Sequence, residues 1–259
     1  HVKLNSFEGP LPEKILEFEG RSPVGCDHVI QHVLPNMLKY DGSYKKNIAF
    51  CPLESLFFSR TKWHHHLRMM SETWVPSTTN AANLSYMPWC SDMDIHVVPH
   101  AFDMSAYNKE YPKYPLPSDL ATNFNFYYIG EWSRRKNVKD VLRAFHLAFN
   151  RSHPVGIFIK TFIPGKTPEQ AADIILGEID GIKRALKVYP SLDRYIAESV
   201  STERLTDEQI HGVHSTGDVF VTATRGEGFC IPAFEAMAHG KTPIVTANAG
   251  IDFVDSKNG

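Results

Sequence analysis

The sequence has 259 residues, of which 42% are hydrophobic, and it carries a formal net charge of −2 at pH 7. This near-neutral balance argues against a dedicated nucleic-acid-binding protein, which would show a basic excess. The sequence contains no run of about 18 or more apolar residues, the length that a membrane-spanning helix needs. The length suits one large domain or two modest ones, and the chain does not begin with the charged and then apolar pattern of a secretory leader.

Short apolar runs alternate with helical patterns along nearly the whole chain. Strands are predicted at 26–34, 47–52, 73–76, 95–99, 124–130, 155–161, 195–200, 217–223 and 242–247. Helices are predicted at 11–20, 60–71, 137–151, 167–189, 206–214 and 231–239. This alternation is typical of right-handed βαβ units, so we expect parallel sheets with helices on both faces.

One segment without periodicity interrupts this alternation. Residues 104–123 contain three prolines among tyrosines and polar residues, a composition that is typical of a connection between domains. We therefore expect an N-terminal Rossmann-like lobe at 1–105, a linker at 106–122 and a C-terminal Rossmann-like lobe at 123–259. Two complete lobes would need about 300 residues or more, so both lobes are expected to be shortened.

The cysteines do not form a pattern that is typical of a disulfide scaffold or a metal site. They are widely spaced, and no CxxC motif occurs among Cys26, Cys51, Cys90 and Cys230. Two disulfides could be drawn among them, but the spacing favours reduced thiols in a cytoplasmic protein.

A cluster of histidines in the second predicted helix raises the question of metal binding. Consecutive positions such as His64, His65 and His66 point to different sides of a helix, so they do not readily share one ion. We therefore expect no metal site here. The basic and aromatic residues around this stretch could contact a membrane surface, but a solvated helix between two strands is favoured.

Two acids lie eight positions apart near the C-terminus. Glu227 follows the predicted strand 217–223, and Glu235 lies in the next predicted helix, after Pro232 in its first turn. In open α/β sheets, ligands bind beyond the carboxyl ends of strands, where helix N-termini attract anions. Carboxylates there could accept hydrogen bonds from vicinal diols, which fits a nucleotide sugar. Alternatively, Glu227 is a solvated turn residue and Glu235 a charge on the helix surface.

The longer string TRGEGFCIPAFEAMAHGKTPIVT, residues 224–246, resembles the E-x7-E signature of the family 4 retaining glycosyltransferases. The resemblance extends to YYIGEWSRRKNVKDVLRAFHLAF at 127–149, and to WVPSTTNAANL and VVPHAFD, which look like the last strands of the family's N-terminal lobe. It covers most of residues 26–259. It implies an α/β protein with the GT-B fold, in which two Rossmann-like lobes face a cleft.

The resemblance also implies roles for individual residues. Glu235 would bind the ribose hydroxyls and Glu227 would contact the transferred sugar, while Lys136 matches the lysine that neutralises the diphosphate. A fixed positive charge there would stabilise the departing nucleoside diphosphate. The other residues expected on the donor side are Gly130, Arg134, Lys160, Gly228, Phe229, Cys230 and Ile231.

One position departs from the family pattern. An arginine often follows the glycine of this strand and reaches the phosphates, but Glu131 stands here. An acid cannot perform that role, so the alternatives are that Arg134 or Lys160 replaces the missing arginine or that the affinity for the donor is low.

The N-terminal half contributes two acceptor-side candidates. His32 ends the first predicted strand and resembles the family's histidine near the anomeric carbon, where it could orient the acceptor or the donor sugar. The alternative is a packed or surface histidine. Glu54, which follows the strand 47–52, is the second candidate.

The predicted function is a hexosyltransferase of carbohydrate biosynthesis that moves a sugar from a UDP- or GDP-linked donor, with retention, to an unidentified glycan, lipid or protein. No cofactor or metal is expected, because the helix end and basic side chains would replace the ion. The alternative is a nucleotide-sugar-binding fragment or degenerate homologue without turnover, since no glycine-rich loop precedes residue 26. A dinucleotide dehydrogenase is discarded, because no GxGxxG motif follows a strand.

Overall fold

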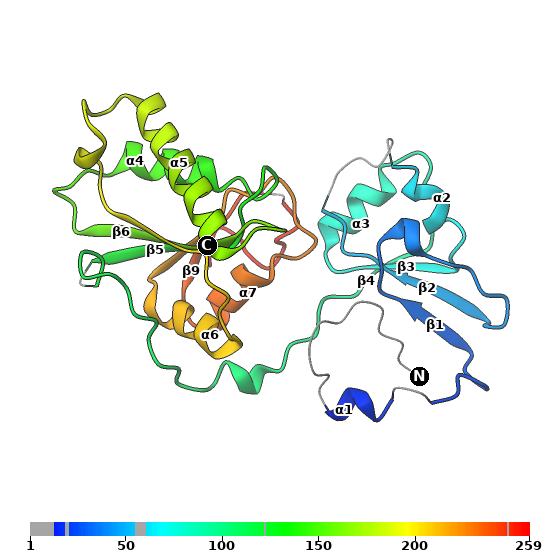
Figure 1. The fold of residues 1–259 in the computed structure, drawn as a ribbon. Helices are drawn as coiled ribbons and strands as arrows, with labels where there is room; N and C mark the ends of the chain where they lie inside the picture. The colour runs from blue at the N-terminus through cyan, green and yellow to red at the C-terminus, as the bar shows by residue number, and fades with distance from the viewer. Residues whose placement is uncertain (1–12, 19–20, 55–60, 122, 248) are drawn as a thin grey trace.

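The structure, a computed structural model, describes residues 13–18, 21–54, 61–121, 123–247 and 249–259. It contains two parallel sheets that form successive units along the chain (Figure 1). The strands are β1 (His28–Gln31), β2 (Lys46–Phe50), β3 (Glu72–Val75), β4 (Ile95–Val97), β5 (Phe124–Glu131), β6 (Val155–Phe162), β7 (Glu198–Ser201), β8 (Val219–Val221) and β9 (Thr242–Ile244). The helices are α1 (Glu13–Leu16), α2 (Trp63–Leu67), α3 (Thr78–Ser85), α4 (Val138–Ala148), α5 (Pro168–Leu186), α6 (Asp207–Thr216) and α7 (Ile231–Ala238), with short 3-10 turns η1 (Pro35–Met37), η2 (Met104–Ala106) and η3 (Leu192–Arg194).

The N-terminal sheet has the order β1-β2-β3-β4, with every neighbouring pair parallel. The sequence predicted its strands, with one at 73–76, but it predicted no helix after that strand and so missed α3. The structure ends β3 at Val75 and begins α3 after Ser77, whose side chain accepts a hydrogen bond from the Asn80 backbone N–H. This N-cap and the burial of Leu84 in the core favour a helix over a longer strand. Parts of the predicted helices 11–20 and 60–71 lie outside the described residues.

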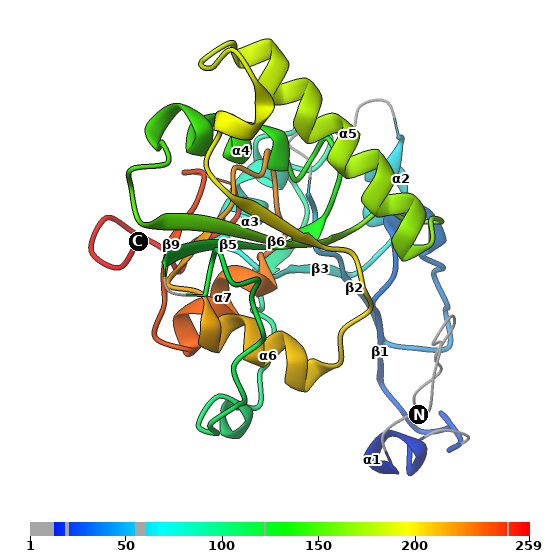
Figure 2. The same cartoon turned by 60° about the vertical axis from the view of Figure 1, so that its left-hand side comes forward.

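The C-terminal sheet has the order β7-β6-β5-β8-β9 and is also parallel throughout. Helices α4 and α5 cover one face, while α6 and α7 cover the other (Figures 1 and 2). The chain leaves β5 toward β6 through α4 and later returns to the other side of β5 as β8. This reversal makes the carboxyl ends of β5 and β8 the topological switch point, which is where open α/β sheets bind ligands.

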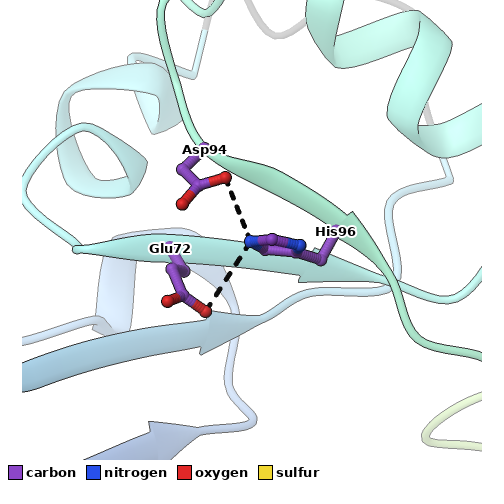
Figure 3. Close-up of side chains that lie close together, drawn as sticks. All are labelled: Glu72, Asp94 and His96. Carbon is purple, nitrogen blue, oxygen red and sulfur yellow. Dashed lines mark ion pairs between the residues drawn. The ribbon is translucent and has the colours of Figure 1, made fainter.

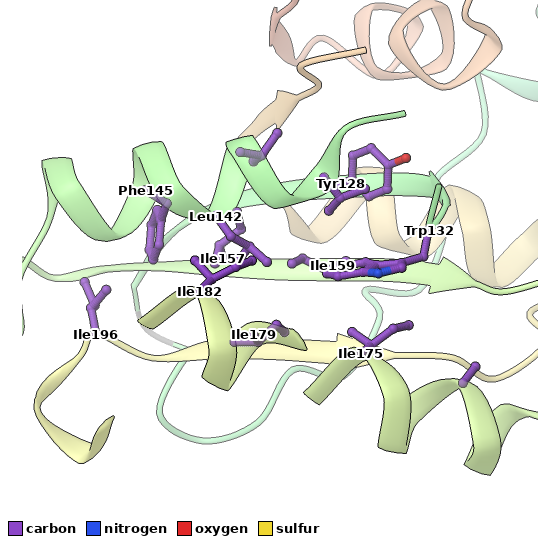
Figure 4. Packing of buried hydrophobic residues seen from close by; sticks show 13 residues of the cluster. Tyr128, Trp132, Leu142, Phe145, Ile157, Ile159, Ile175, Ile179, Ile182 and Ile196 are labelled. Atoms are coloured by element: carbon purple, nitrogen blue, oxygen red, sulfur yellow. The ribbon is translucent and has the colours of Figure 1, made fainter. Parts of the chain in front are cut away.

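The largest apolar core lies between this sheet and its two long helices. Tyr128 and Ile159 from the strands pack against Leu142 of α4 and Ile175 of α5, and all four are at most 1% exposed (Figure 4). Strands buried on both faces need continuous apolar runs, which is why β5 and β6 were recognisable in the sequence. The core therefore fixes β5 and the start of α4 firmly.

The structure also describes the state of the cysteines and the character of the helices. All four cysteines are free thiols, with Cys26 exposed and the others buried. Among the described residues, no helix is long and apolar enough to span a membrane.

Side chains from the two sheets meet in a small polar latch. Thr78 and Thr79, at the start of α3, donate hydrogen bonds to the carboxylate of Asp252 from their hydroxyls and from the Thr79 backbone N–H, over distances of 2.5–3.0 Å. Close by, the buried Asn80 side chain donates to the Glu227 carbonyl oxygen at 3.2 Å. Helix α3 thus ties the N-terminal sheet to the turn that carries Glu227.

We expect Asp252→Ala to weaken this latch by about 1 kcal/mol, since hydrogen bonds to a partly exposed charge contribute modestly. Burial alone would raise the pKa of Asp252, but the hydrogen bonds from Thr78 and Thr79 outweigh it and lower this pKa below its ordinary value of 3.8. The latch should therefore be complete above that value and be lost as the pH falls through the lowered pKa. Small-angle scattering should show a larger radius of gyration for Asp252→Ala at pH 7, and an unchanged radius would contradict the latch.

Candidate functional site

Two turns lie together at the switch point of the C-terminal sheet. The turn after β5 contains Arg135 and Asn137, and the turn after β8 contains Arg225. The Arg225 backbone N–H donates to the Arg135 carbonyl at 2.9 Å, and the Asn137 side chain donates to the Ala223 carbonyl at 3.0 Å. These bonds hold the two turns in one fixed arrangement.

Glu227 is the centre of this arrangement. Its side chain is only 4% exposed, yet it lies between two cations. Lys136 Nζ is 2.7 and 2.9 Å from the two carboxylate oxygens, Arg135 Nη1 is 3.2 Å from Oε2, and the Thr224 hydroxyl donates to Oε1 at 2.8 Å. A buried carboxylate requires such partners. The structure thus brings together Lys136 and Glu227, two residues that the sequence analysis predicted to act together although 91 positions separate them.

Arg135 extends this network to the N-terminal sheet. Its guanidinium lies 3.0 Å from Glu54 Oε1 and donates to the Gly226 carbonyl at 2.9 Å. Burial raises the pKa of Glu54, although the nearby Arg135 charge opposes this rise. The acceptor-side candidate Glu54 therefore lies against the same cation as Glu227.

The two sheets approach each other closely at this point. A Cβ atom on Gly228 would lie 2.7 Å from the Pro52 side chain, and one on Gly226 would collide with the Glu54 carbonyl. The glycines that flank Glu227 thus allow the turn after β8 to contact the loop after β2. The E-x7-E segment therefore needs these two small residues for packing.

His32 reaches the same interface through a row of rings. It is exposed just after β1, its ring centroid lies 4.7 Å from that of Phe50 and 6.4 Å from that of His100, and His100 contacts Phe229 at 5.4 Å. In the described part of the chain, His32 makes no hydrogen bond or ion pair with Glu227. Through His100 and Phe229 it lies near the contact between the two sheets.

Glu235 lies in a different environment from Glu227. Its side chain is 20% exposed, and its Oε2 is 3.5 Å from Nε2 of the buried His214 in α6. Tyr107, which follows η2, lies near the same carboxylate. Burial raises the pKa of Tyr107 to about 12, and the negative charge of Glu235 adds to this effect. No ion pair joins Glu235 to Lys136 within the described residues, so Glu227 and Glu235 have separate partners.

The residues at the start of α7 are well ordered by their packing. Cys230 is the N-cap and has a left-handed φ of 67°. Burial raises the pKa of its thiol to about 12, so the sulfur stays protonated and is a poor nucleophile. The Phe229 ring contacts Phe102, Phe234 and Phe253, and Ile231 is 44% exposed. The backbone at 229–231 is therefore fixed beside Glu227.

Four residues named in the sequence analysis lie apart from the Glu227 network, namely Arg134, Lys160, Gly130 and Glu131. Arg134 is exposed and lines a pocket with Trp132 and Arg225. Lys160 is buried and donates to the Thr161 carbonyl at 3.2 Å, and burial lowers its pKa. A Cβ on Gly130 would collide with the Tyr128 ring, and Glu131 makes no ion pair among the described residues. Neither Arg134 nor Lys160 contacts Glu227, whereas Arg135 does.

The sequence analysis missed four residues of this region. Arg135 is one of three consecutive basic residues, and Thr224 is one of many threonines, so neither stood out. Tyr107 lies in the segment without periodicity, and His214 is one of 13 histidines. The spacing between the predicted turn residues and Arg135 offered a weak signal for it, but nothing in the sequence indicated the other three.

A second ionisable cluster lies at the amino-end side of the N-terminal strands. His96 Nε2 is 3.0 Å from Asp94 Oδ1 and 3.8 Å from Glu72 Oε2 (Figure 3). It is the only group of three potential metal ligands in the part of the chain that the structure describes. However, Lys46 forms an ion pair with the Glu72 carboxylate, and Trp74 Nε1 donates to it at 3.1 Å. With these partners, the cluster is a surface ion-pair network away from the switch point.

Comparison with known proteins places this site in a family. Residues 123–259, slightly more than half of the chain, match the family model described as glycosyl transferases group 1. This segment contains Lys136, Glu227 and Glu235. No curated protein sequence matches the chain.

Solved structures resemble the chain in fold at low sequence identity. A UDP-forming α,α-trehalose-phosphate synthase from Burkholderia xenovorans, in complex with glucose-6-phosphate, is 11% identical with a TM-score of 0.60, and the match covers 80% of this chain and 55% of that one. A structure described as trehalose-6-phosphate from E. coli bound with UDP-2-fluoro glucose is 13% identical with a TM-score of 0.59. The match covers 79% of this chain and 54% of that one. S. aureus TarM, in complex with Fondaparinux, alpha-GlcNAc-glycerol and UDP, is 12% identical, with a TM-score of 0.56 and coverages of 83% and 40%.

These likenesses confirm the predicted fold class, which is α/β with two Rossmann-like units in the GT-B arrangement. The chain spans about half the length of the solved structures that it matches.

Proposed function

The chain belongs to the group 1 glycosyl transferases, and from this premise we propose that it forms the donor-binding core of a retaining hexosyltransferase that uses a UDP- or GDP-linked sugar. The observation that carries the proposal is the meeting of Lys136, Arg135 and Glu227 at the switch point. Two cations beside a buried carboxylate, next to the start of α7, suit a ligand with both a diphosphate and hydroxyl groups.

The proposed roles follow from charge and position. Lys136 and Arg135 would neutralise the diphosphate, the backbone N–H groups near Phe229 and Cys230 would approach it, and Glu227 would accept hydrogen bonds from the transferred sugar. Because two cations and a helix end are present, the proposal requires no metal ion. The acceptor oxygen would bond to the anomeric carbon on the face that the phosphate leaves, and the departing nucleoside diphosphate would take the acceptor's proton.

The N-terminal sheet would supply the acceptor side. We propose lobes at 1–105 and 123–259 joined by a linker at 106–122, with His32 and Glu54 facing the acceptor. Glu54 lies 3.0 Å from Arg135, so its carboxylate would interact electrostatically with the cation that also faces the donor phosphates. The acceptor itself, whether glycan, lipid or protein, is set by surfaces that these residues do not define.

A second candidate is a nucleotide-sugar-binding protein without turnover. It is favoured by Glu131, which stands where an arginine often contacts the phosphates, and by the pairing of Arg135 and Lys136 with acids. A panel of UDP- and GDP-sugars, followed by thermal shift and then by release of nucleoside diphosphate, separates the two. Release would support transfer, stabilisation without release would support binding alone, and neither effect with any donor would overturn both.

The role of Glu235 gives a direct prediction. In Glu235→Ala, ribose hydroxyls would lose their acceptor in a partly buried site, which should cost about 1–3 kcal/mol. The dissociation constant of the bound nucleoside diphosphate should therefore rise roughly 5- to 150-fold, as measured by calorimetry. Glu227→Ala should instead weaken the binding of the sugar-bearing donor more than the binding of the bare nucleoside diphosphate. Equal losses for both ligands in both variants would contradict these roles.

A further inference from the structure

A chain of three buried or half-buried polar groups crosses the C-terminal unit behind Glu235. Tyr127 comes from the central strand β5, His214 from α6 and Glu235 from α7. The Tyr127 hydroxyl lies 2.9 Å from His214 Nδ1, and His214 Nε2 lies 3.5 Å from Glu235 Oε2. Tyr127 and His214 are both 0% exposed. These three groups thus connect the central strand of the sheet to a carboxylate that is 20% exposed.

The direction of the hydrogen bonds follows from the protonation states. Burial lowers the pKa of His214, although hydrogen bonding to Glu235 opposes this, and burial raises the pKa of Tyr127. A neutral imidazole has one N–H. If that proton were on Nδ1, the lone pair of Nε2 would face the Glu235 carboxylate, which is repulsive. Tyr127 therefore donates to Nδ1, and the Nε2–H group of His214 points at Glu235.

His214 Nε2 has no other acceptor in the described part of the chain. It is buried and lacks a close hydrogen bond, and Glu235 is the acceptor that it faces. The neighbouring imidazoles of His211 and His239 form a hydrogen bond with each other, with His211 Nδ1 2.9 Å from His239 Nε2. A buried N–H left without an acceptor is costly, so the protein gains when Glu235 stays in front of it.

From this geometry we infer that His214 is a positioning residue, which holds Glu235 in the orientation that binds the ribose hydroxyls of the donor. The inference rests on the proposed function. A carboxylate has about four acceptor positions. The Nε2–H group of His214, 3.5 Å from Oε2, therefore orients the carboxylate and leaves acceptor positions for a diol. The distance of 3.5 Å would shorten on binding, as such contacts often do when a ligand arrives.

The test compares nucleotides that differ only in the ribose. The probes are UDP and GDP, each beside its 2′,3′-dideoxy analogue, and the readout is the ratio of their dissociation constants. For the wild-type protein, the dideoxy analogue of the bound nucleotide should bind roughly 10- to 100-fold more weakly. In His214→Leu this ratio should fall to within about 3-fold of unity, because a carboxylate that is free to rotate forms poorer bonds to the diol. His214→Gln, which keeps an N–H donor, should recover at least half of the lost ratio on a logarithmic scale.

The chain offers a matched control for loss of a buried histidine. His146 is 1% exposed, and its Nε2 lies 3.6 Å from Glu198 Oε2, away from the candidate site. His146→Leu should lower thermal stability as His214→Leu does, but leave the ribose ratio unchanged. In a Glu235→Ala background, His214→Leu should have no further effect on the ratio, since the two residues act as one unit.

Each remaining outcome decides a different point. An unchanged ratio in His214→Leu, with wild-type nucleotide binding intact, would overturn the positioning role and leave the proposed function standing. A ratio that falls equally in His146→Leu would also overturn it, because the effect would then follow from stability alone. If the wild-type protein bound neither UDP nor GDP, the proposed function itself would fail.

Discussion

Replacing Lys136 with methionine is expected to lower the free energy of unfolding by about 2–4 kcal/mol. The change leaves the Glu227 carboxylate, which is 4% exposed, without its nearer cation, and breaking a buried ion pair typically costs about 3–5 kcal/mol. The expected loss is somewhat smaller because Arg135 remains 3.2 Å away. Urea denaturation at pH 7 would measure this loss.

A lysine in an exposed ion pair provides the control. Lys139 pairs with Glu178 at 2.9 Å, with side chains 43% and 37% exposed, and Lys139→Met should cost no more than about 1 kcal/mol. The double variant Lys136→Met, Glu227→Gln should recover more than half of the loss, because no buried charge is left alone. Equal losses in Lys136→Met and Lys139→Met would mean that Glu227 is far better hydrated than its burial indicates.

The strands and the meeting of Lys136 with Glu227 could be predicted because they depend on local patterns. Parallel strands buried on both faces are continuous apolar runs, and β5 and β8 carry such runs directly before their turns. Once these strands are adjacent, their carboxyl ends bring the two turns together. The family resemblance then assigned roles to positions that the topology had already placed side by side.

The neighbours of Glu235 could not be predicted in the same way. His214 reaches Glu235 because α6 and α7 cover the same face of the sheet, and Tyr107 because the segment after η2 passes over both. These contacts depend on the tertiary path of the chain, and no periodicity in the sequence encodes them. Helix α3 was missed for a related reason, since its Ser77 cap and its core contacts outweigh the weak helical preference of its threonines.

The choice among the three consecutive basic residues also depended on backbone geometry. Asn137 has a left-handed φ of 56° and ends the turn just before α4. Residues along an irregular turn point in directions set by each φ and ψ, so sequence order does not say which one faces the site. The structure directs Arg135 and Lys136 toward Glu227 and leaves Arg134 exposed. Under the proposed function, Arg135 would be a further candidate for the cation beside the phosphates, next to Arg134 and Lys160.

Arg135→Gln should therefore lower turnover more than it weakens donor binding. The phosphate gains negative charge as the glycosidic bond stretches, so a cation beside it stabilises the transition state more than the bound donor. Removing one preorganised partner of such a developing charge typically lowers kcat by about 100- to 1,000-fold. We expect a fall of that order in nucleoside diphosphate release, while the dissociation constant of the donor rises less than about 10-fold. Lys136 still pairs with Glu227 in this variant, so the fold should be retained.

Arg143→Gln is the matched control, because Arg143 is an exposed arginine of α4 that pairs with Asp140 outside the Glu227 network. It should leave both the rate and the donor affinity within about 2-fold of the wild type, as expected for a weak surface pair. If Arg135→Gln raised the dissociation constant as much as it lowered turnover, the charge of Arg135 would act equally on the bound donor and the transition state. In that case the role of Arg135 would be donor capture, and stabilisation of the leaving phosphate would fall to Lys136 and the start of α7.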